Sequence, residues 1–580
     1  MDLFNRNRNK YSKDACGNSS MTPSEKSDQD QDDYSSRSFS SDQDSDYESE
    51  YGKDYFENNG RCNKFQWDGV KRRFPVLEFD TQAFFNEDTN LKKNGQDFGL
   101  VCKVSGNAQI MRDILMAHGF YETHRSTRCF NLNWAANHPG PYYIRGMAHF
   151  QTINHFPQTK ELTRKDKLFK NVIKMQKLHG KEHFDFVPQS FVLPNEYRAF
   201  RSYFKQDNGP FILKPVGLSR GRGVSLITKP RQALKKTETG KRNVVCKYIP
   251  NPLILNGYKF DLRIYVAVTS FDPLLIYVYK EGLTRFATVK YDMDSGTYEN
   301  LCMHLTNYSI NMTNSDYIKN VDPAIENVGN KWSLGALLRH LRSIGKDPTA
   351  IMVEIEDVII KTILSVEWRV GLACKRYVRQ DSNCFELFGF DILLDENYKA
   401  WLIEVNLSPS LGCDTPIDVK IKSNMLCDLL NLVGLRCYSP SNYFCGRKDY
   451  GFTDKLIERI QVTVGYYYYS KCRELIHLVF GLHNAKKQFK MLVAEEKERH
   501  ASERDKQPKV ENHKREPATL TLTLSPKEIE MIRQVREEET RSGGWQRVFP
   551  TADSWDKYWG FLSFPTRNNL ILHQRLFPEM

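Results

Sequence analysis

Short apolar runs separated by turn residues dominate the chain from Gly209 to Val289. Their β-branched and aromatic residues predict strands. The runs are PFILKPV, GVSLIT, NVVCKYI, FDLRIYVAVTS, LLIYVYKEG and LTRFATV. Two stretches with apolar residues at i, i+3 and i+4, about 332–347 and 350–378, then predict helices. Two further apolar runs joined by a polar turn follow in FGFDILLDENYKAWLIEVNLSPS, 388–410. This order of strands, helices and strands predicts an α+β core with mixed sheets.

The flanking regions contain their own helix and strand signals. Phe98–Phe120 predicts a strand followed by a helix, and Trp134–Tyr143 predicts a loop and a strand. Thr163 is a candidate N-cap for a basic helix. Near the end of the chain, Ser525-Pro-Lys-Glu528 forms a capping box, and the helix that it starts is expected to end at Gly543-Gly544.

Changes in composition predict five parts in the 580 residues. Residues 1–60 are polar and acidic with almost no aliphatic side chains, which predicts disorder. We expect an N-terminal α/β domain at 66–195 and two catalytic subdomains at 196–435. A basic region or linker, 446–515, precedes a helical C-terminal segment, 525–580.

Charge and cysteine usage limit the classes of function. The formal net charge of +12 predicts an acidic partner, which could be nucleic acid, a membrane surface or an acidic protein. Thirteen cysteines without a CxxC pair argue against a disulfide framework or a zinc site and favour a reducing compartment. The first residues contain no apolar signal-peptide core, and no uncharged run reaches membrane-spanning length. We therefore expect a soluble intracellular protein.

The paired runs at 388–410 carry oxygen ligands where a metal could bind. Glu404 and Asn406 point the same way because strand side chains alternate. The polar turn Asp395–Lys399 places Asp391 opposite Ile403, to within one residue of register. Mg²⁺ prefers such oxygen ligands and accompanies phosphates. The alternative is three polar strand ends that face water.

A glycine-rich loop between two strands supports the metal hypothesis. In FILKPVGLSRGRGVSLI, 211–227, Lys214 ends the first strand, and Arg220-Gly221-Arg222-Gly223 lets the backbone approach a phosphate. The pattern differs from the Walker motif, so no phosphate-binding helix is expected.

Further charged residues lie where a plain core strand would have none. Lys259, Asp261 and Arg263 share one face of KFDLRIYV, and buried charges are costly unless they are paired. Arg285 and the polar stretch Thr306–Ser309 extend the pattern. Mg²⁺, a nucleotide and a second anionic ligand would explain these charges together.

These segments resemble, in order, the tubulin–tyrosine-ligase-like family of the ATP-grasp superfamily. The resemblance covers roughly 74–435 and includes NHFPQTKELTRKDKL, 154–168, as well as NKWS and WLIEVNLSPSL. Within the family, the chain is most similar to the polyglutamylase branch. RSGGWQRVFPTADSWDKYWGFL resembles the end of the shared region in the type 5 subgroup.

The resemblance implies an ATP-grasp-like core that uses ATP and Mg²⁺. An acceptor carboxylate attacks the γ-phosphate of ATP to give an acyl phosphate, and the amino group of a free amino acid then forms an isopeptide bond. Asp391, Glu404 and Asn406 match the Mg²⁺ ligands, and Arg263 matches a residue that stabilises the transferring phosphoryl group, so Arg263, Lys214 and Glu404 are the expected catalytic residues. The matching nucleotide contacts are Lys214, Arg220, Gly221, Cys246, Lys247, Tyr248, Ile249, Lys259, Phe260, Asp261, Thr306 and Asn307.

The resemblance places the free amino acid near Arg285, Tyr308, Ser309, Lys331 and Lys422. The guanidinium fork of Arg285 suits an α-carboxylate, and Lys331 suits a side-chain carboxylate. This pair of cations favours L-glutamate over glycine or tyrosine. Leu407, after Asn406, resembles members that start side chains rather than extend them.

The expected partner is tubulin, whose acidic C-terminal tails suit the basic charge, with no nucleic acid or membrane partner. Residues 446–515 match a cationic microtubule-binding region, although the run at 460–484 is more apolar and Tyr-rich than a simple basic helix. We expect a monomer in the cytoplasm on the microtubule cytoskeleton, with cilium, axoneme, centriole and basal body as candidate sites. A glycine ligase of the same fold and an inactive microtubule-binding scaffold are the alternatives.

Overall fold

The computed structural model describes residues 65–68, 74–86, 95–124, 127–237, 242–322, 324–380, 383–445, 524–563 and 565–577. All of them belong to the unit Asn63–Met580, and a second unit comprises Met1–Cys62. The predictions for the acidic segment 1–60 and the basic region 446–515 lie outside the described residues. The predicted α+β class is confirmed by the sheets and helices of the described unit.

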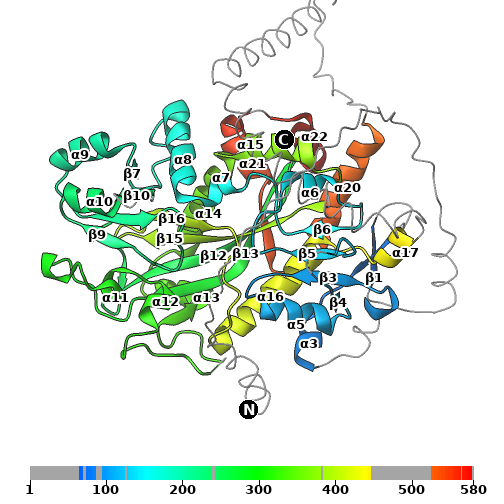
Figure 1. The fold of residues 1–580 in the computed structure, drawn as a ribbon, viewed down its shortest axis with the longest axis horizontal. Helices are drawn as coiled ribbons and strands as arrows, with labels where there is room; N and C mark the ends of the chain where they lie inside the picture. Colours follow the sequence, from blue (N-terminus) through cyan, green and yellow to red (C-terminus); the bar gives the residue numbers. More distant parts are fainter. Residues whose placement is uncertain are drawn as a thin grey trace, which may run out of the picture. The chain divides into compact units, whose positions relative to one another are not determined.

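A long antiparallel sheet forms the centre of this unit (Figure 1). Its strand order is β14-β13-β12-β15-β16, with β11 paired to β12 and β17 paired to β13. The strands are β11 (Ile254–Leu255), β12 (Tyr258–Phe271), β13 (Leu274–Phe286), β14 (Lys331–Ser333), β15 (Glu386–Leu394), β16 (Ala400–Asn406) and β17 (Trp545–Phe549).

The two faces of the central sheet bury different residues, as the strand period of two requires. Leu262, Ile264 and Val266 of β12 contribute to one hydrophobic cluster, whereas Tyr265 and Ala267 contribute to another. The first cluster includes residues of α13 (Leu334–Ser343), α14 (Pro348–Leu364) and α15 (Glu367–Tyr377). The second includes residues of α16 (Pro416–Val433) and α5 (Gln109–Ala117).

A smaller antiparallel sheet carries the predicted glycine-rich loop. Its order is β7-β10-β8-β9, and α9 and α10 lie beside it in Figure 1. The elements are β7 (Ser190–Leu193), β8 (Phe211–Pro215), β9 (Ser225–Ile227), β10 (Asn243–Lys247), α9 (Tyr197–Gln206) and α10 (Pro230–Thr237). The loop between β8 and β9 is therefore the connection of a short hairpin.

The N-terminal part contains a parallel sheet in the order β4-β3-β5-β6. Its strands are β3 (Val101–Val104), β4 (Tyr121–Glu122), β5 (Leu132–Trp134) and β6 (Thr152–Ile153). The helices and the hairpin nearby are α3 (Thr81–Asn86), α6 (Pro141–Arg145), α7 (Lys160–Thr163), α8 (Lys165–His179), β1 (Phe65–Asp68) and β2 (Phe74–Leu77). Parallel strands alternating with helices agree with an α/β arrangement.

The remaining helices complete the described chain. They are α11 (Leu301–His304), α12 (Tyr308–Asn311), α17 (Pro440–Cys445), α20 (Pro526–Thr540), α21 (Ala552–Tyr558) and α22 (Arg567–Leu576), with 3-10 turns at Ser295–Thr297 and Trp559–Phe561. None of the helices described is both long enough and apolar enough to span a membrane.

Three local predictions are wrong. Trp134–Tyr143 contains the end of a strand and then a helix, because Pro141 occupies the first turn of α6 after Gly140. Thr163 ends α7, and Arg164 precedes α8 without a side-chain cap. The helix expected at 350–378 is two helices, since the hydroxyls of Thr362 and Ser365 donate to carbonyls of the preceding turn where α14 ends.

Strand β13 joins two runs that the sequence pattern separates at Gly282. A Cβ at Gly282 would lie 2.5 Å from the carbonyl oxygen of Arg263, so only glycine lets the two strands approach closely here. The register of β12 against β13 also shifts between Ile264 and Val266.

The capping box at Ser525 is confirmed, and α20 ends at Thr540, slightly before the predicted glycines. Strand β17 adds a sheet element to the expected helical segment.

Candidate active site

A row of charged side chains crosses one face of the central sheet. Residues directly opposite each other in an antiparallel pair share a face. Lys331 lies opposite Arg285, and Arg285 lies opposite Asp261. Two residues along β12, Arg263 lies opposite Asp391, which pairs in turn with Glu404. Five neighbouring strands therefore contribute charges to one face.

Asp391 is the centre of this row. Its carboxylate accepts hydrogen bonds from Arg263 Nε at 2.6 Å and Nη2 at 3.1 Å, and Arg285 Nη2 lies 3.0 Å away. Burial alone would raise the pKa of Asp391, but the two guanidinium groups hold it well below its usual range. Asp391 therefore stays ionised at any physiological pH.

Glu404 and Asn406 complete the predicted oxygen set. Asp391 pairs with Glu404 and Gly389 with Asn406, so the register prediction is confirmed to within its stated one residue. The amide nitrogen of Asn406 donates to Gly389 O at 3.2 Å and lies 3.4 Å from Asp391 Oδ2. This orientation leaves the amide oxygen available as a ligand.

The donor set suits Mg²⁺. No group of three His, Cys, Asp or Glu side chains with metal-site geometry occurs among the residues that the structure describes. Asp391, Glu404 and Asn406 supply two carboxylates and one amide oxygen, and Mg²⁺ in nucleotide sites takes few protein ligands and completes its shell with phosphates and water. The set therefore fits Mg²⁺ bound together with a phosphate.

Lys165 also reaches this site, a contact that the basic pattern of its helix does not predict. Its Nζ lies 3.0 Å from Glu404 Oε2 and 3.4 Å from Leu218 O in the glycine-rich loop. Lys165 is the first residue of α8, and it stands within the motif NHFPQTKELTRKDKL. Membership of that motif was the available signal.

A cavity between the two antiparallel sheets collects most of the predicted nucleotide residues. It is lined by Lys214, Arg220, Gly221, Cys246, Lys247, Tyr248, Ile249, Lys259, Asp261, Thr306, Asn307, Asp391 and Glu404, among others. Phe260 does not line it, because its side chain points to the opposite face of β12 from Lys259 and Asp261 and packs on Phe286. The expectation that Phe260's side chain contacts a nucleotide is therefore not supported by its position.

The loop over this cavity needs its glycine. Gly221 has φ of +70°, and a Cβ there would lie 2.4 Å from Ile310 Cδ1. Arg220 also adopts positive φ, and its carbonyl accepts a hydrogen bond from Ser309 Oγ at 2.9 Å. Ser309 thus contacts the loop. This contact links a residue predicted to bind the amino acid to residues predicted to bind the nucleotide.

Two lysines stand inside the cavity with few acidic partners. Lys214 Nζ lies 3.5 Å from Ile403 O, and Lys259 Nζ donates to Tyr248 Oη at 2.8 Å and lies over its ring. Burial lowers the pKa of Lys259 to about 7, with Lys214 adding to the effect and Asp261 opposing it. An anion bound at this position would raise that pKa, and the charged ammonium would in turn stabilise the bound anion. Lys247, by contrast, directs its ammonium to Asp207.

A second cationic group lies at the β14 end of the row. Asp418 lies between two lysines, 2.5 Å from Lys331 Nζ and 2.8 Å from Lys422 Nζ. These lysines hold the pKa of the buried Asp418 low, and Lys331 also lies over the ring of Tyr308 at 4.8 Å. Asp418 was not among the predicted site residues; it forms a capping box with Thr415, which the pattern Thr-Pro-x-Asp indicates.

Arg285 differs from the sequence expectation of an open fork. Its Nε and Nη2 donate to the two oxygens of Asp261 at 2.8 and 2.5 Å. An amino-acid α-carboxylate at Arg285 would therefore have to share this guanidinium with Asp261 and Asp391.

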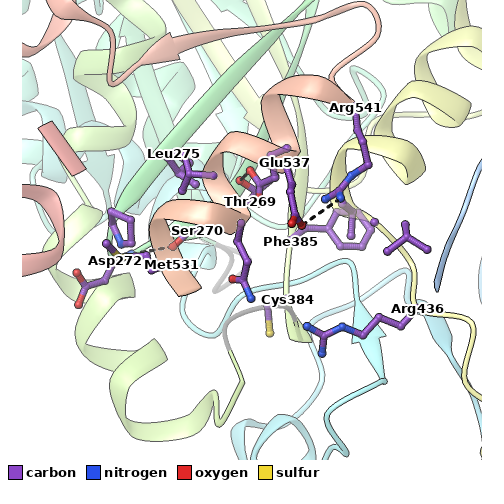
Figure 2. Close-up of a pocket in the computed structure, with 17 residues that line it drawn as sticks. Thr269, Ser270, Asp272, Leu275, Cys384, Phe385, Arg436, Met531, Glu537 and Arg541 are labelled. Atoms are coloured by element: carbon purple, nitrogen blue, oxygen red, sulfur yellow. Dashed lines mark hydrogen bonds and ion pairs between the residues drawn. The ribbon is translucent and has the colours of Figure 1, made fainter. Parts of the chain in front are cut away.

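Another cavity lies at the opposite ends of β12 and β13, against α20 (Figure 2). Its charges have partners within the protein. Thr269 Oγ1 and Tyr277 Oη donate to Glu538 at 2.7 and 2.9 Å, and Asp272 pairs with Lys375 at 3.0 Å. Figure 2 also shows Arg541 directed at Glu537, 3.7 Å away.

Comparison with known proteins places the chain among the relatives of one enzyme family. The model described as "Tubulin-tyrosine ligase family" matches residues 145–442. The chain is 43% identical over 515 residues to "Tubulin polyglutamylase TTLL5" of Mus musculus, covering 88% of this chain and 36% of that protein. It is 35% identical over 442 residues to "Tubulin monoglutamylase TTLL4" of Homo sapiens, covering 76% of this chain and 34% of that protein.

A shorter relative is covered for most of its length. "Tubulin polyglutamylase ttll-4" of Caenorhabditis elegans is 33% identical over 466 residues, which are 80% of this chain and 69% of that protein. The chain spans little more than a third of the mouse relative's length.

Proposed function

The chain belongs to the tubulin–tyrosine ligase family, and we propose that it is an ATP-dependent ligase that joins free L-glutamate to glutamate side chains of tubulin tails. The relatives named as tubulin polyglutamylases support this substrate class. The observation that carries the proposal is the charged row. It connects a cation-lined cavity that suits a nucleotide to a second cationic group that suits an amino acid.

In the proposed reaction the acceptor carboxylate oxygen attacks the γ-phosphorus of ATP, and ADP leaves with the electrons of the broken P–O bond. The α-amino nitrogen of glutamate then attacks the acyl carbon, phosphate leaves, and the amine loses a proton. ADP, phosphate and one isopeptide bond result. Positioning and charge neutralisation are the main contributions of a protein to phosphoryl transfer.

We assign the phosphate contacts to Lys214, Lys259 and the loop at Arg220 and Gly221. Mg²⁺, held by Asp391, Glu404 and Asn406, would neutralise phosphate charge. Arg263 fixes Asp391 through two hydrogen bonds and adds positive charge beside it. The hinge residues Cys246–Ile249 form the wall of the cavity that suits an adenine base.

We assign the amino-acid side chain to Lys331 and Lys422. Together with Asp418 they form a group with one net positive charge, which a carboxylate would balance. Glycine has no side-chain carboxylate to use this charge, so the group favours a glutamate ligase over the glycine alternative. An inactive scaffold would not require the two neighbouring carboxylates of Asp391 and Glu404 that suit a metal ion.

On the microtubule cytoskeleton, ATP, free glutamate and tubulin should be consumed together. ADP formation is measured with microtubules and glutamate together and with each omitted in turn. We expect ADP to form in step with glutamate incorporation only when both are present. Equal ADP formation with glycine in place of glutamate would overturn the assignment of Lys331 and Lys422.

A further inference from the structure

The smaller sheet and its helices carry most of the chain's excess positive charge. Residues 190–247 contain thirteen Lys and Arg but only three Asp and Glu, against a net charge of +12 for all 580 residues. Such a local excess of positive charge attracts acidic partners, and without one the like charges repel each other and destabilise the folded state.

The nucleotide cavity accounts for only part of this charge. Ile212, Lys214 and Cys246 line the cavity from one face of the sheet. Phe211, Leu213 and Val245 alternate with them and pack on the other face, against Phe200 of α9 and Ala233 of α10. Helices α9 and α10 therefore cover the face of the sheet directed away from the nucleotide, as their position beside it in Figure 1 also indicates.

The outer surfaces of these two helices are basic. We call the exposed side chains of Arg198, Arg201, Lys205, Arg231, Lys235 and Lys236 the helical basic face. On α9 the spacing i, i+3, i+7 places the first three on one side, opposite the buried Phe200. The face continues toward the cavity, because Lys236 Nζ donates to Ser225 Oγ at 2.6 Å and Ser225 begins the strand after the glycine-rich loop.

These cations differ from those of the neighbouring helix α8. There, Arg164 pairs with Asp166, Lys165 with Glu404 and Lys167 with Glu161. In the part of the chain that the structure describes, no carboxylate lies within ion-pair distance of Arg198, Arg201, Lys205, Arg231 or Lys235. The two described carboxylates of residues 190–247 are engaged elsewhere, Glu196 by the Val192 amide and Asp207 by Lys247.

We propose that the helical basic face binds an acidic stretch of the protein substrate beside the acceptor glutamate. This inference rests on the proposed function, in which the acceptor is one carboxylate among several. The cavity can neutralise the reacting carboxylate, but its acidic neighbours need cations outside the cavity. The helical basic face supplies unpaired cations on the element that carries the glycine-rich loop.

The test measures binding without turnover. The probe is a fluorescently labelled Glu-rich peptide, and its Kd is measured by anisotropy at low and at physiological salt. The triple variant Arg198→Glu, Arg201→Glu, Lys205→Glu should bind at least about tenfold more weakly at low salt, with a smaller difference at higher salt. The Kd for ATP should not change.

A matched control separates local from global charge. Lys177→Glu, Arg342→Glu, Arg376→Glu alters the charge equally at exposed positions of α8, α13 and α15. We expect the control to retain the wild-type Kd to within about twofold. Equal weakening in both triple variants would overturn the proposal, since net charge alone would then explain binding.

A milder variant guards against misfolding. Arg231→Gln, Lys235→Gln removes two charges from α10 and should weaken peptide binding by about threefold. Peptide affinity that survives in both variants, or a loss seen only with an RNA probe, would contradict the proposal. If the wild type incorporates no glutamate but the variants still lose peptide affinity, the proposed function fails and the binding surface stands.

Discussion

Two cavities adjoin the long strands β12 and β13, and they differ in how their charges are balanced. In the cavity against α20, Glu538 accepts two hydroxyl hydrogen bonds and Asp272 pairs with Lys375. In the cavity between the sheets, Lys214 and Lys259 contact a carbonyl and a phenol rather than a carboxylate.

This difference distinguishes a cavity whose polar groups stabilise helix packing from a cavity that binds a ligand. Buried polar groups that satisfy one another stabilise the packing of α20 and need no ligand. Buried cations without carboxylate partners lower the stability of the ligand-free protein. A bound anion offsets this cost by pairing with them. The account therefore predicts large effects on activity from one cavity and effects on stability from the other.

The largest effect is expected for Glu404→Gln. The change removes one carboxylate of the proposed Mg²⁺ site and almost no volume, so kcat should fall by roughly 100- to 1000-fold. Microtubule binding, measured by co-sedimentation, should be retained. Glu396→Gln in the exposed turn of the same hairpin is the control and should keep full activity. A Glu404→Gln enzyme that stays active would remove Glu404 from the metal site.

A smaller effect is expected for Lys331→Met. Loss of one cation beside Asp418 should raise the KM for glutamate by about 10- to 100-fold, because a charge-assisted hydrogen bond is lost. The KM for ATP should stay the same, since Lys331 does not line the nucleotide cavity. Lys319→Met, an exposed change in the same segment, is the control. A parallel rise in both KM values would point to a general disturbance of the sheet.

Lys259 should make ATP binding depend on pH. Burial lowers the pKa of its ammonium to about 7 in the free protein, and bound phosphate raises it again. ATP binding then takes up a proton above pH 7, so the Kd for ATP should rise by up to about tenfold per pH unit from 7 upward. Calorimetry checks this, with Lys259→Met expected to give a flat profile over the same range and the exposed Lys290→Met to behave as wild type. A flat wild-type profile would contradict the role of Lys259.

The smallest effect on activity is expected for Glu538→Gln. It makes the oxygen that accepts both hydroxyl hydrogen bonds in the cavity against α20 a neutral, weaker acceptor, and it should lower the free energy of unfolding by ~1–3 kcal/mol. Thermal unfolding should shift downward while kcat and both KM values remain unchanged. Glu539→Gln, at a side chain 60% exposed, should leave both unchanged. Loss of activity in Glu538→Gln at a temperature where the protein is folded would break the distinction between the two cavities.

The parts of the site that could be predicted follow local rules. The alternation of strand side chains and the polar turn brought Asp391 opposite Glu404 to within one residue. The same period of two places Phe260 on the wrong face, although the resemblance to the family includes it.

The parts that could not be predicted depend on contacts between distant segments. Lys165 meets Glu404 only because α8 reaches the end of β16, and the motif around Lys165 does not indicate which residue it contacts. Strand β17 pairs with β13 from the far end of the chain. Arg285 shares its guanidinium between Asp261 and Asp391, which requires three strands in register.

The most direct test of the central claim is the mass of the tubulin tails after reaction. The full chain is incubated with microtubules, Mg-ATP and isotopically labelled glutamate, and the released tails are measured by mass spectrometry. The account predicts tails heavier by whole labelled glutamyl residues, with none added when ATP is omitted. Tails that gain glycine, or that gain nothing from any amino acid, would contradict the claim that this site is a glutamate ligase.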